Sequence, residues 1–336
     1  MENGSEVKTR MLLAGDIGGT KTLLGLFDSA PARPRPIAVR SFGTLDFDDL
    51  PTMIAAFLQA ADPSASAPGA IATACFGVAG PVIDESAELT NVPWRVDARQ
   101  VAAAFGFHRV SLLNDLEAMA YGVTVLRESE VHVLQEGEAL RGGNIGLIAA
   151  GTGLGQALLH NIDGRFVPSA SEGGHADFAA RNEREMVLVR SLIARFGRAD
   201  VEHVISGRGF FNLHPIAHHQ PCTGGVDLTD PNAPAEISSA ALEHRCPGCV
   251  ETLEMFVEAY GAESGNLALR TVSTGGLFVG GGIAPKILPA LTSGAFMRAF
   301  RAKQPLDKML AAMPVKVILN DEAGLLGAAV FAAGAR

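Results

Sequence analysis

The chain lacks most of the sequence features of secreted proteins and of membrane proteins. Its 336 residues include only four cysteines, Cys75, Cys222, Cys246 and Cys249, which is too few for a disulfide framework in a chain of this size. No run of 18 uncharged apolar residues occurs, and the first ten residues are polar, unlike the apolar stretch of a signal peptide. We therefore expect a cytoplasmic protein without a membrane anchor.

Positive charge is also scarce. Lys and Arg number 27 against 36 Asp and Glu, which gives a formal net charge of −9. A general affinity for nucleic acid or for anionic membrane requires a basic surface, so neither is expected as a partner. The hydrophobic content of 48% is ample for packed cores, and the length predicts two domains rather than one.

The two best-known nucleotide loops are absent as well. Neither the GxxxxGK[ST] spacing nor a GxGxxG that opens a helix is present. Instead, two glycine-rich turns are each flanked by apolar runs, in MLLAGDIGGTKTLLGLFD (11–28) and NIGLIAAGTGLGQALL (144–159). Each pattern predicts a strand, a tight turn and a second strand, with backbone amides free to converge on an anion. Their repetition indicates two related lobes that share one polyphosphate.

The first turn combines an acidic residue with glycines. The residues predicted to lie against a nucleotide are Gly15, Asp16, Ile17, Gly18, Gly19 and Thr20. Asp16 would repel phosphate unless a cation lay between them, so it is better placed to hold the Mg²⁺ bound to ATP. The alternative is an Asx-type hairpin turn that binds nothing. A second, similar turn at Gly151, Thr152 and Gly153 favours the nucleotide-binding interpretation. The role of Lys21 stays open.

The cysteines raise one question about metal. Cys246 and Cys249 form a CxxC pair, and Cys222 could add a third thiolate to a four-ligand zinc site. However, the pair runs directly into a strongly helical stretch, and no second pair of closely spaced Cys or His follows it. The simpler interpretation is a helix N-terminus, so we expect no structural zinc.

The order of predicted elements indicates an α/β layer architecture. Strands are expected at residues 70–78 and 109–114, and helices near residues 51–61 and 97–105. Beyond Glu183 the sequence becomes more helical, in EMVLVRSLIARFG and in the run from Cys249 to Ala268. The second lobe should therefore be the larger and more helical one.

One acidic residue lies where a strand gives way to a helix. The strand RVSLLN ends at Asn114, and a helix is predicted to begin at once with Asp115. Either residue could simply cap this helix. Ligands of α/β sheets also lie outside the carboxyl ends of strands, where a carboxylate can act as a catalytic base. With two phosphate loops already inferred, the catalytic interpretation of Asp115 is favoured, and capping by Asn114 does not exclude it.

Nine short segments, spread in order over nearly the whole chain, carry a family resemblance. They are GDIGGTKT, TNVPW, LLNDLEAMAYGV, GTGLG, EGGHADFA, VEHVISGRG, GNLAL, GGLFVGGGIAPK and NDEAGLLGAA. In this order they resemble the bacterial glucokinases, a family of the hexokinase and actin-like ATPase superfamily. The resemblance implies two lobes built on ribonuclease-H-like cores, with the last helix, after Asp321, returning to the N-terminal lobe. We therefore expect a small lobe of residues 1–115 and 322–336 and a large lobe of residues 116–321.

The same resemblance implies an activity and its residues. The activity is transfer of the γ-phosphoryl group of ATP, accompanied by Mg²⁺, to the 6-hydroxyl of glucose. Asp115 matches the family's catalytic base, and the matching sugar ligands are Asn114, Asp115, Glu172, His175 and Glu202. Carboxylates, an amide and an imidazole suit a pyranose, whose hydroxyls both donate and accept hydrogen bonds. Gly281 resembles the family's adenosine-side segment, where the absent side chain lets the nucleoside lie against the backbone.

Alternatives stay open at several points. Glu172 and His175 could belong to a turn whose polar groups serve the backbone, and Gly281 could end an ordinary buried strand. The acceptor could be another hexose, such as fructose, mannose or an amino sugar. A non-catalytic sugar sensor is a further alternative, disfavoured because signalling would not require a base at Asp115. Glucose and ATP are the expected partners, and the oligomeric state is left open, with a homodimer among the outcomes.

Overall fold

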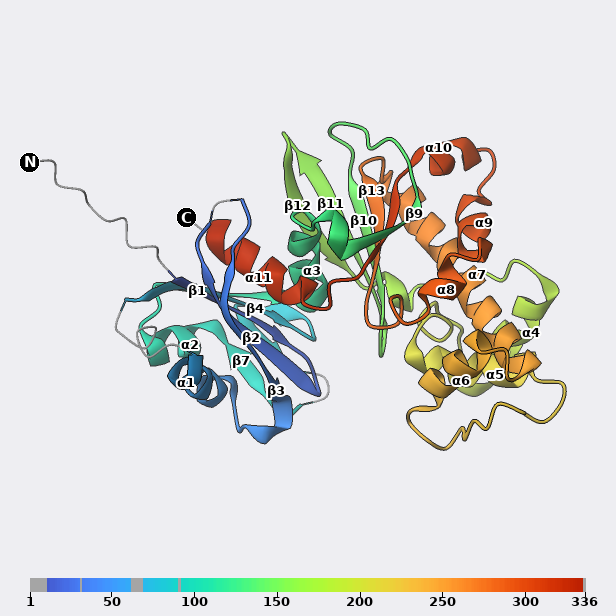
Figure 1. The fold of residues 1–336 in the computed structure, drawn as a ribbon, viewed down its shortest axis with the longest axis horizontal. Coiled ribbons are helices and arrows are strands. Elements are labelled where there is room, and N and C mark those ends of the chain that lie inside the picture. The colour runs from blue at the N-terminus through green and yellow to red at the C-terminus, as the bar shows by residue number, and fades with distance from the viewer. Residues whose placement is uncertain (1–10, 31, 62–68, 90–91, 335–336) are drawn as a thin grey trace, which may run out of the picture. The chain divides into compact units, whose positions relative to one another are not determined.

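The computed structural model describes residues 11–30, 32–61, 69–89 and 92–334 (Figure 1). The chain divides into two units, of which the first comprises the residues up to Leu126 together with those from Glu322, and the second comprises Arg127–Asp321. Thr90 and Asn91 of the TNVPW segment fall outside the described residues. Within the described ranges, no helix is long and apolar enough to cross a membrane.

The first unit is built on a five-stranded sheet with the order β3-β2-β1-β4-β8. Its strands are β1 (Met11–Ile17), β2 (Lys21–Asp28), β3 (Pro36–Gly43), β4 (Ile71–Val78) and β8 (Arg109–Asn114), and a small second sheet holds β5 (Val82–Ile83), β6 (Ser86–Glu88) and β7 (Arg95–Asp97). β1, β2 and β3 are antiparallel neighbours, whereas β4 is parallel to both β1 and β8. The carboxyl ends of β1, β4 and β8 therefore lie along one edge of the sheet.

The helices of the first unit bury apolar residues, and the last of them is buried on all sides over residues 323–329. They are α1 (Leu50–Ala61), α2 (Ala98–Phe105), α3 (Asp115–Val123) and α11 (Ala323–Gly334), with a short 3₁₀ helix at Thr44–Asp46. In α1, Met53, Ile54 and Phe57 recur at helical spacing and are fully buried in the core of this unit. Asp97 caps α2 by accepting hydrogen bonds from two backbone N–H groups of its first turn.

Helices α3 and α11 approach each other backbone to backbone. A Cβ on Gly327 would lie 1.7 Å from the carbonyl oxygen of Ala118, and one on Gly122 would lie 2.3 Å from that of Ala323. Only glycine permits so close an approach. The contact brings the C-terminal helix into the first unit, as the resemblance implies. It also keeps α3 there, whereas the expected boundary assigns residues 116–123 to the large lobe.

The second unit repeats this sheet with one strand added. Its order is β12-β11-β10-β13-β14-β9, and its strands are β9 (Val131–Gln135), β10 (Ile145–Ala150), β11 (Leu154–Ile162), β12 (Arg165–Ser171), β13 (Gly276–Gly280) and β14 (Val315–Ile318). β10, β11 and β12 are antiparallel neighbours, while β13 is parallel to both β10 and β14. Apart from β9, order and direction match the first unit, which confirms the predicted α/β class with ribonuclease-H-like cores.

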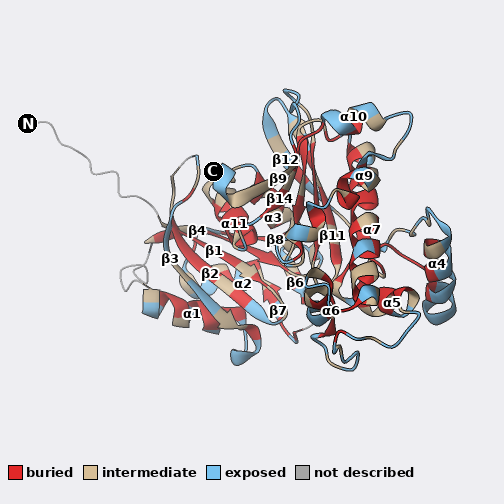
Figure 2. Cartoon of the chain, turned by 45° about the vertical axis from the view of Figure 1, so that its right-hand side comes forward, coloured by how far each residue is buried: buried red, intermediate tan, exposed pale blue. Residues whose placement is uncertain are grey.

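Helices make up more of the second unit than of the first. They are α4 (Glu183–Phe196), α5 (Gly207–Ala217), α6 (Ala233–Leu242), α7 (Pro247–Thr271), α8 (Leu288–Leu291), α9 (Ala295–Arg301) and α10 (Asp307–Ala312), with 3₁₀ helices at Glu128–Glu130 and Gly173–His175. Figure 2 shows α7 buried along most of its length. It packs against α5, α6, α9 and β10, so it forms the centre of the unit's larger core.

The α3–α11 contact gives a stability prediction. Gly327→Ala should lower the free energy of unfolding by about 1–3 kcal/mol, because the new methyl group overlaps the carbonyl of Ala118. Gly334→Ala, in the same helix, places its Cβ in open space and should change stability by no more than about 0.5 kcal/mol. Urea denaturation measures both. Equal midpoints for the two variants would contradict the backbone contact.

Candidate active site

Two acidic side chains lie at one edge of the first sheet. Asp16 is the penultimate residue of β1, and Asp115 begins α3 directly after β8. The parallel register aligns Asp16 with Gly77 of β4, and Gly77 with Leu113 of β8. The carboxyl ends of these strands therefore bring both carboxylates to the same edge, which is where α/β sheets bind ligands.

The two carboxylates influence each other electrostatically. Burial and then the negative charge of Asp115 raise the pKa of Asp16 to about 6, although the charge of Lys21 opposes the shift. With a pKa of about 6, the Asp16 carboxyl is half protonated only one pH unit below neutrality. The effect also gives Lys21 a role that the sequence leaves open, because this side chain stabilises the ionised form of Asp16.

Asn114 and Asp115 are both held by the start of α3. The side-chain oxygen of Asn114 accepts a hydrogen bond from the N–H of Leu116 at 3.0 Å, and its amide nitrogen donates to the carbonyl of Gly80 at 3.2 Å. One carboxylate oxygen of Asp115 accepts from the same N–H at 2.8 Å. The capping interpretation is therefore correct for Asn114, and these bonds fix the direction of both side chains.

The turn between β1 and β2 is held in shape by Thr44. The hydroxyl of Thr44 donates to the carbonyl of Gly18 at 2.8 Å, and its N–H donates to the carbonyl of Thr20 at 3.0 Å. The N–H of Gly18 itself donates to the carbonyl of Lys21 at 3.0 Å. The turn is thus preformed, and the Gly18 amide already has a partner inside it.

In the second unit, the turn between β10 and β11 is tied to Glu202. A carboxylate oxygen of Glu202 accepts a hydrogen bond from the N–H of Leu154 at 2.8 Å. A Cβ on Gly153 would lie 2.5 Å from that same oxygen, so glycine makes room for the carboxylate. The Gly151 carbonyl accepts from the N–H of Gly207 at 2.8 Å, which anchors the turn to the start of α5. Glu202, predicted as a sugar ligand, therefore also contacts the second predicted phosphate loop.

Glu202 links this turn to the other two predicted sugar ligands. Its N–H donates to the carbonyl of Gly174 at 2.9 Å, in the 3₁₀ helix that follows Glu172 and ends at His175. The side chains of Glu172 and His175 are exposed to solvent. The structure thus brings Glu172, His175 and Glu202 together within the second unit, whereas Asn114 and Asp115 belong to the first.

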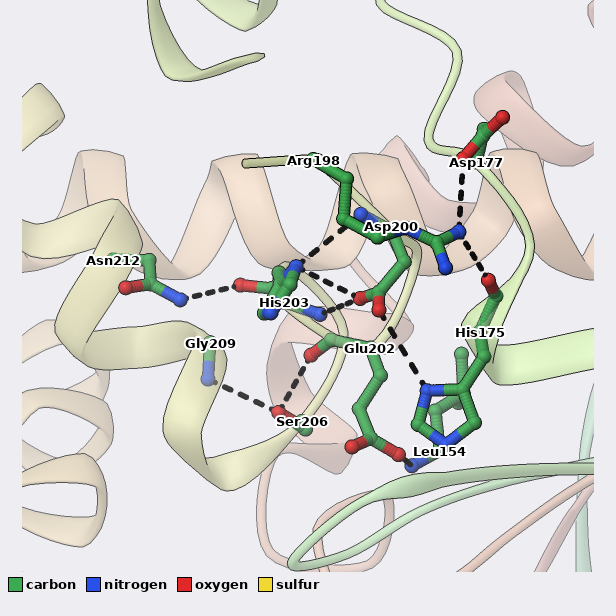
Figure 3. Close-up of polar contacts among 10 residues, drawn as sticks. All are labelled: Leu154, His175, Asp177, Arg198, Asp200, Glu202, His203, Ser206, Gly209 and Asn212. Atoms are coloured by element: carbon green, nitrogen blue, oxygen red, sulfur yellow. Dashed lines mark hydrogen bonds and ion pairs between the residues drawn. The ribbon is translucent and has the colours of Figure 1, made fainter. Parts of the chain in front are cut away.

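Asp200 and Arg198 support His175, and the sequence did not single them out. Nδ1 of His175 lies 3.6 Å from one oxygen of Asp200, whose other oxygen accepts from the N–H of His203 at 2.8 Å (Figure 3). Arg198 donates to the His175 carbonyl at 2.6 Å. Asp200 is buried although it is acidic, and a buried carboxylate is retained only where it is hydrogen-bonded. The sequence does not reveal that burial.

A cavity of about 760 Å³ opens beside the Gly151 turn. It is lined by Gly151 and Thr152, by the first turns of α5, by α6 with the residues before it, and by Gly282, Ile283, Lys286 and Ile287. The turn at Gly281 packs on the end of β10, where the N–H of Ile283 donates to the Ala150 carbonyl at 3.2 Å. The second predicted phosphate loop and the segment after the predicted adenosine-side glycine therefore face one cavity, of a size typical of ligand sites.

Tyr260 joins the two strands that end at this cavity. Its buried hydroxyl accepts a hydrogen bond from the N–H of Ala150 at 3.2 Å and donates to the carbonyl of Gly280 at 3.2 Å. It thus fixes β10 and β13 just before the Gly151 and Gly281 turns. The sequence shows only a tyrosine on the apolar face of a helix, so nothing in it indicated this contact.

The structure brings a histidine to the cysteines. Nε2 of His218, the residue that caps the end of α5, lies 3.4 Å from Sγ of Cys246 and 3.9 Å from Sγ of Cys249. A fourth potential ligand therefore lies beside Cys222 and the CxxC pair. The sequence argument looked for a partner after the pair, whereas His218 precedes Cys246 by 28 residues.

Comparison with known proteins decides the family. A sequence model described as Glucokinase matches residues 13–335. The chain belongs to the glucokinase family. A glucokinase of Synechocystis sp. is 39% identical, over 96% of this chain and 97% of that protein, and one of Nostoc punctiforme is 39% identical, over 96% and 99%. The crystal structure of a glucokinase from an Antarctic psychrotroph superposes with a TM-score of 0.83 at 28% identity, covering 97% of this chain and 99% of that one.

The contact between Glu202 and the Gly151–Gly153 turn can be tested in this glucokinase-family chain. Gly153→Ala should displace the carboxylate from the Leu154 N–H, which costs about 1 kcal/mol and increases hydrogen exchange at that amide. Gly151→Ala is the matched control, because nothing lies within 4 Å of its added Cβ. Thermal melting and exchange measured by mass spectrometry should change only in the first variant. Unchanged protection of Leu154 in Gly153→Ala would contradict the contact.

Proposed function

We propose that the protein transfers the γ-phosphoryl group of ATP to the 6-hydroxyl of glucose. Its membership of the glucokinase family over residues 13–335 supports an ATP-dependent glucose kinase activity. The observation that connects this activity with particular residues is the pair of carboxylates, Asp16 and Asp115, at one edge of the first sheet. We assign Asp115 to proton transfer and Asp16 to binding the cation.

Asp115 is the proposed catalytic base. Its backbone position at the start of α3 and its bond to the Leu116 N–H orient the carboxylate. The carboxylate accepts the proton of the sugar 6-hydroxyl while that oxygen attacks the γ-phosphorus in line. Because a carboxylate is a weak base, orientation of the hydroxyl and late acceptance of the proton are its main contributions.

Asp16 is the proposed residue for the cation that accompanies ATP. Mg²⁺ prefers hard oxygen ligands and binds through few protein carboxylates. Burial and then the charge of Asp115 raise the pKa of Asp16, so a cation beside this carboxylate would stabilise its ionised form. The residue therefore fits a divalent cation. When bound, Mg²⁺ neutralises charge on the transferring phosphoryl oxygens. Lys21, the end of β1 with Gly15 and Ile17, and the turn of Gly18, Gly19 and Thr20 complete this side of the proposed phosphate site.

The cavity of the second unit is proposed to hold the nucleoside. Gly151, Thr152 and Gly153 would present their turn to the phosphates, and Gly281 with the residues after it would form the wall beside adenine and ribose. Lys286 adds a positive charge to the lining. We assign the sugar hydroxyls to Asn114, Glu172, His175 and Glu202, whose acceptor and donor groups suit a pyranose. Asp200 and Arg198 act as positioning residues for His175.

A coupled assay tests the function directly. Purified protein with ATP and Mg²⁺ should phosphorylate glucose with a kcat/KM well above those for fructose, mannose and N-acetylglucosamine. Polar groups that pair with one pattern of hydroxyls once the sugar covers them are left unpaired by a sugar with another pattern, which is a strong source of discrimination. Equal or higher kcat/KM for another hexose would assign the protein to that sugar, and no turnover of any hexose would refute the kinase proposal.

The variant Asp115→Asn tests whether this residue acts in catalysis rather than in folding or glucose binding. The amide oxygen still accepts the hydrogen bond from the Leu116 N–H, but the proton acceptor is lost, so kcat should fall about 10²-fold or more while glucose affinity changes little. Glu117→Gln, in the same helical turn, is the control and should keep its kcat. Steady-state kinetics and glucose titration by calorimetry provide the two readouts. A kcat near that of the parent protein would remove Asp115 from the mechanism.

The raised pKa of Asp16 predicts a pH dependence. Because the carboxyl is protonated below a pKa of about 6, kcat/KM for Mg²⁺·ATP should fall about tenfold per pH unit below that value. Folding stability depends on pH in the opposite direction to kcat/KM. A raised carboxyl pKa means that the folded state retains a proton that the unfolded state loses, so this group's contribution to stability declines as pH rises towards 6.

Asp16→Asn tests both consequences. The variant should raise the melting temperature at pH 8, where the parent protein buries a charge, and leave it nearly unchanged at pH 4. It should also lose the acidic limb of the rate profile together with most of the activity. Asp84→Asn, at an exposed position in the same unit, should alter neither. An Asp16→Asn melting shift that is equal at both pH values would contradict the assigned pKa.

A further inference from the structure

Four side chains that can bind a soft metal converge in the second unit. His218 caps the end of α5, Cys222 follows in the next loop, Cys246 caps the start of α7, and Cys249 lies in the first turn of that helix. Sγ of Cys222 lies 3.8 Å from Sγ of Cys246 and 3.7 Å from Sγ of Cys249. Nε2 of His218 lies 3.4 and 3.9 Å from the same two sulfurs.

These separations match the edges of a metal tetrahedron. With zinc–sulfur bonds of about 2.3 Å and zinc–nitrogen bonds of about 2.0 Å, tetrahedral angles give sulfur–sulfur edges of roughly 3.8 Å and sulfur–nitrogen edges of roughly 3.5 Å. A disulfide would require sulfurs at about 2.05 Å, and the cysteines are free thiols. The four measured edges therefore surround a space of the right size for one ion.

The ring of His218 is oriented as a metal ligand would be. Its Nδ1 lies 2.8 Å from the backbone carbonyl oxygen of His214. A carbonyl only accepts, so Nδ1 carries the hydrogen and Nε2 turns a lone pair towards the sulfurs. Metal-binding histidines usually fix their tautomer in this way. Gly248, inside the CxxC pair, makes room for the ring, because a Cβ there would lie 2.5 Å from it.

His214 lies beside the same cluster of side chains. Its ring stacks on that of His218 with centroids 3.6 Å apart, and the side chain is only 5% exposed. Its Nε2 is buried and has no hydrogen-bond partner among the described residues, which is costly for a polar atom. A ligating nitrogen of His214 lies within 4.8 Å of the ligand atoms of His218, Cys222 and Cys249.

We propose that Cys222, Cys246, Cys249 and His218 bind one Zn²⁺ ion as a structural centre. Three thiolates and an imidazole form the closed donor set typical of structural zinc, and soft sulfur ligands disfavour Mg²⁺ and Ca²⁺. Cys246 takes the fourth position rather than His214 because its sulfur lies within 4 Å of both Cys222 and His218. His214 backs the ligating ring by stacking on it.

The centre would join three elements that the sequence separates. It ties the end of α5 to the start of α7 and closes the chain segment between Cys222 and Cys246, which carries α6. Residues of α6 line the 760 Å³ cavity. Because a metal that binds only the folded state adds its binding free energy to folding, loss of zinc should loosen this segment first.

Metal analysis of the intact protein is the primary test. Protein without an affinity tag, purified under reducing conditions without chelator and desalted after incubation with Zn²⁺, should contain about one zinc per chain by mass spectrometry. Cys75→Ala, which changes a buried cysteine of the first unit, should retain it. Cys222→Ser and His218→Gln should lose it and melt about 5 °C or more below the parent protein.

Cobalt substitution identifies the ligands without relying on stability. Co²⁺ in place of Zn²⁺ should give thiolate-to-metal charge-transfer absorption and the intense visible bands of a tetrahedral centre, and both should weaken in each ligand variant but not in Cys75→Ala. Hydrogen exchange of the zinc-free parent should increase between Cys222 and Cys246 before it increases elsewhere. None of these measurements depends on kinase activity. A failure of the zinc proposal can therefore be distinguished from a failure of the proposed function.

Three results would overturn the proposal. One is parent protein that contains no zinc after reconstitution and gives no thiolate–cobalt absorption. Another is a Cys222–Cys246 or Cys222–Cys249 disulfide in the reduced, purified protein. The third is a pattern in which His214→Gln loses the metal while Cys246→Ser keeps it, which would refute the assigned ligand set.

Discussion

The backbone contact between α3 and α11 positions the edge of the first sheet that carries both proposed acidic residues. Gly122 and Gly327 let the two helices meet at a distance that no side chain would permit. The first turn of α11 then lies against Asp16, because a Cβ on Gly324 would be 2.8 Å from its carboxylate. The partner helix α3 begins with Asp115. One helix from the far end of the chain therefore places both proposed acidic residues, and it does so through backbone rather than through side-chain chemistry.

Helix α7 has the corresponding role in the second unit. Midway along it, the Tyr260 hydroxyl joins the ends of β10 and β13 beside the 760 Å³ cavity. At its start, Cys246 and Cys249 meet His218 and Cys222. A rigid helix connects these two places, so fixing its N-terminus also limits the movement of α5 and α6 beside the cavity. Metal binding and nucleotide binding would then share one structural support.

Much of the fold was predictable because it depends on short-range patterns. The strands expected at 70–78 and 109–114 are β4 (Ile71–Val78) and β8 (Arg109–Asn114), and the helices expected near 51–61 and 97–105 are α1 (Leu50–Ala61) and α2 (Ala98–Phe105). Apolar periodicity and turn residues determine such elements locally. The repeated glycine turns likewise predicted two related sheets, which the matching strand orders confirm. The family resemblance is confirmed over nearly the whole chain.

By itself, the sequence determined several strands and helices of the first unit, the two glycine turns, the acidic residue that follows β8 and the family, because each of these depends on residues that are neighbours in the chain. Only the tertiary structure decided which distant groups meet. It showed that His218 joins the cysteines, that Asp200 supports His175, and that Glu202 holds the Leu154 amide. Such contacts depend on how separate helices and turns pack in space, and no local period or spacing encodes that packing.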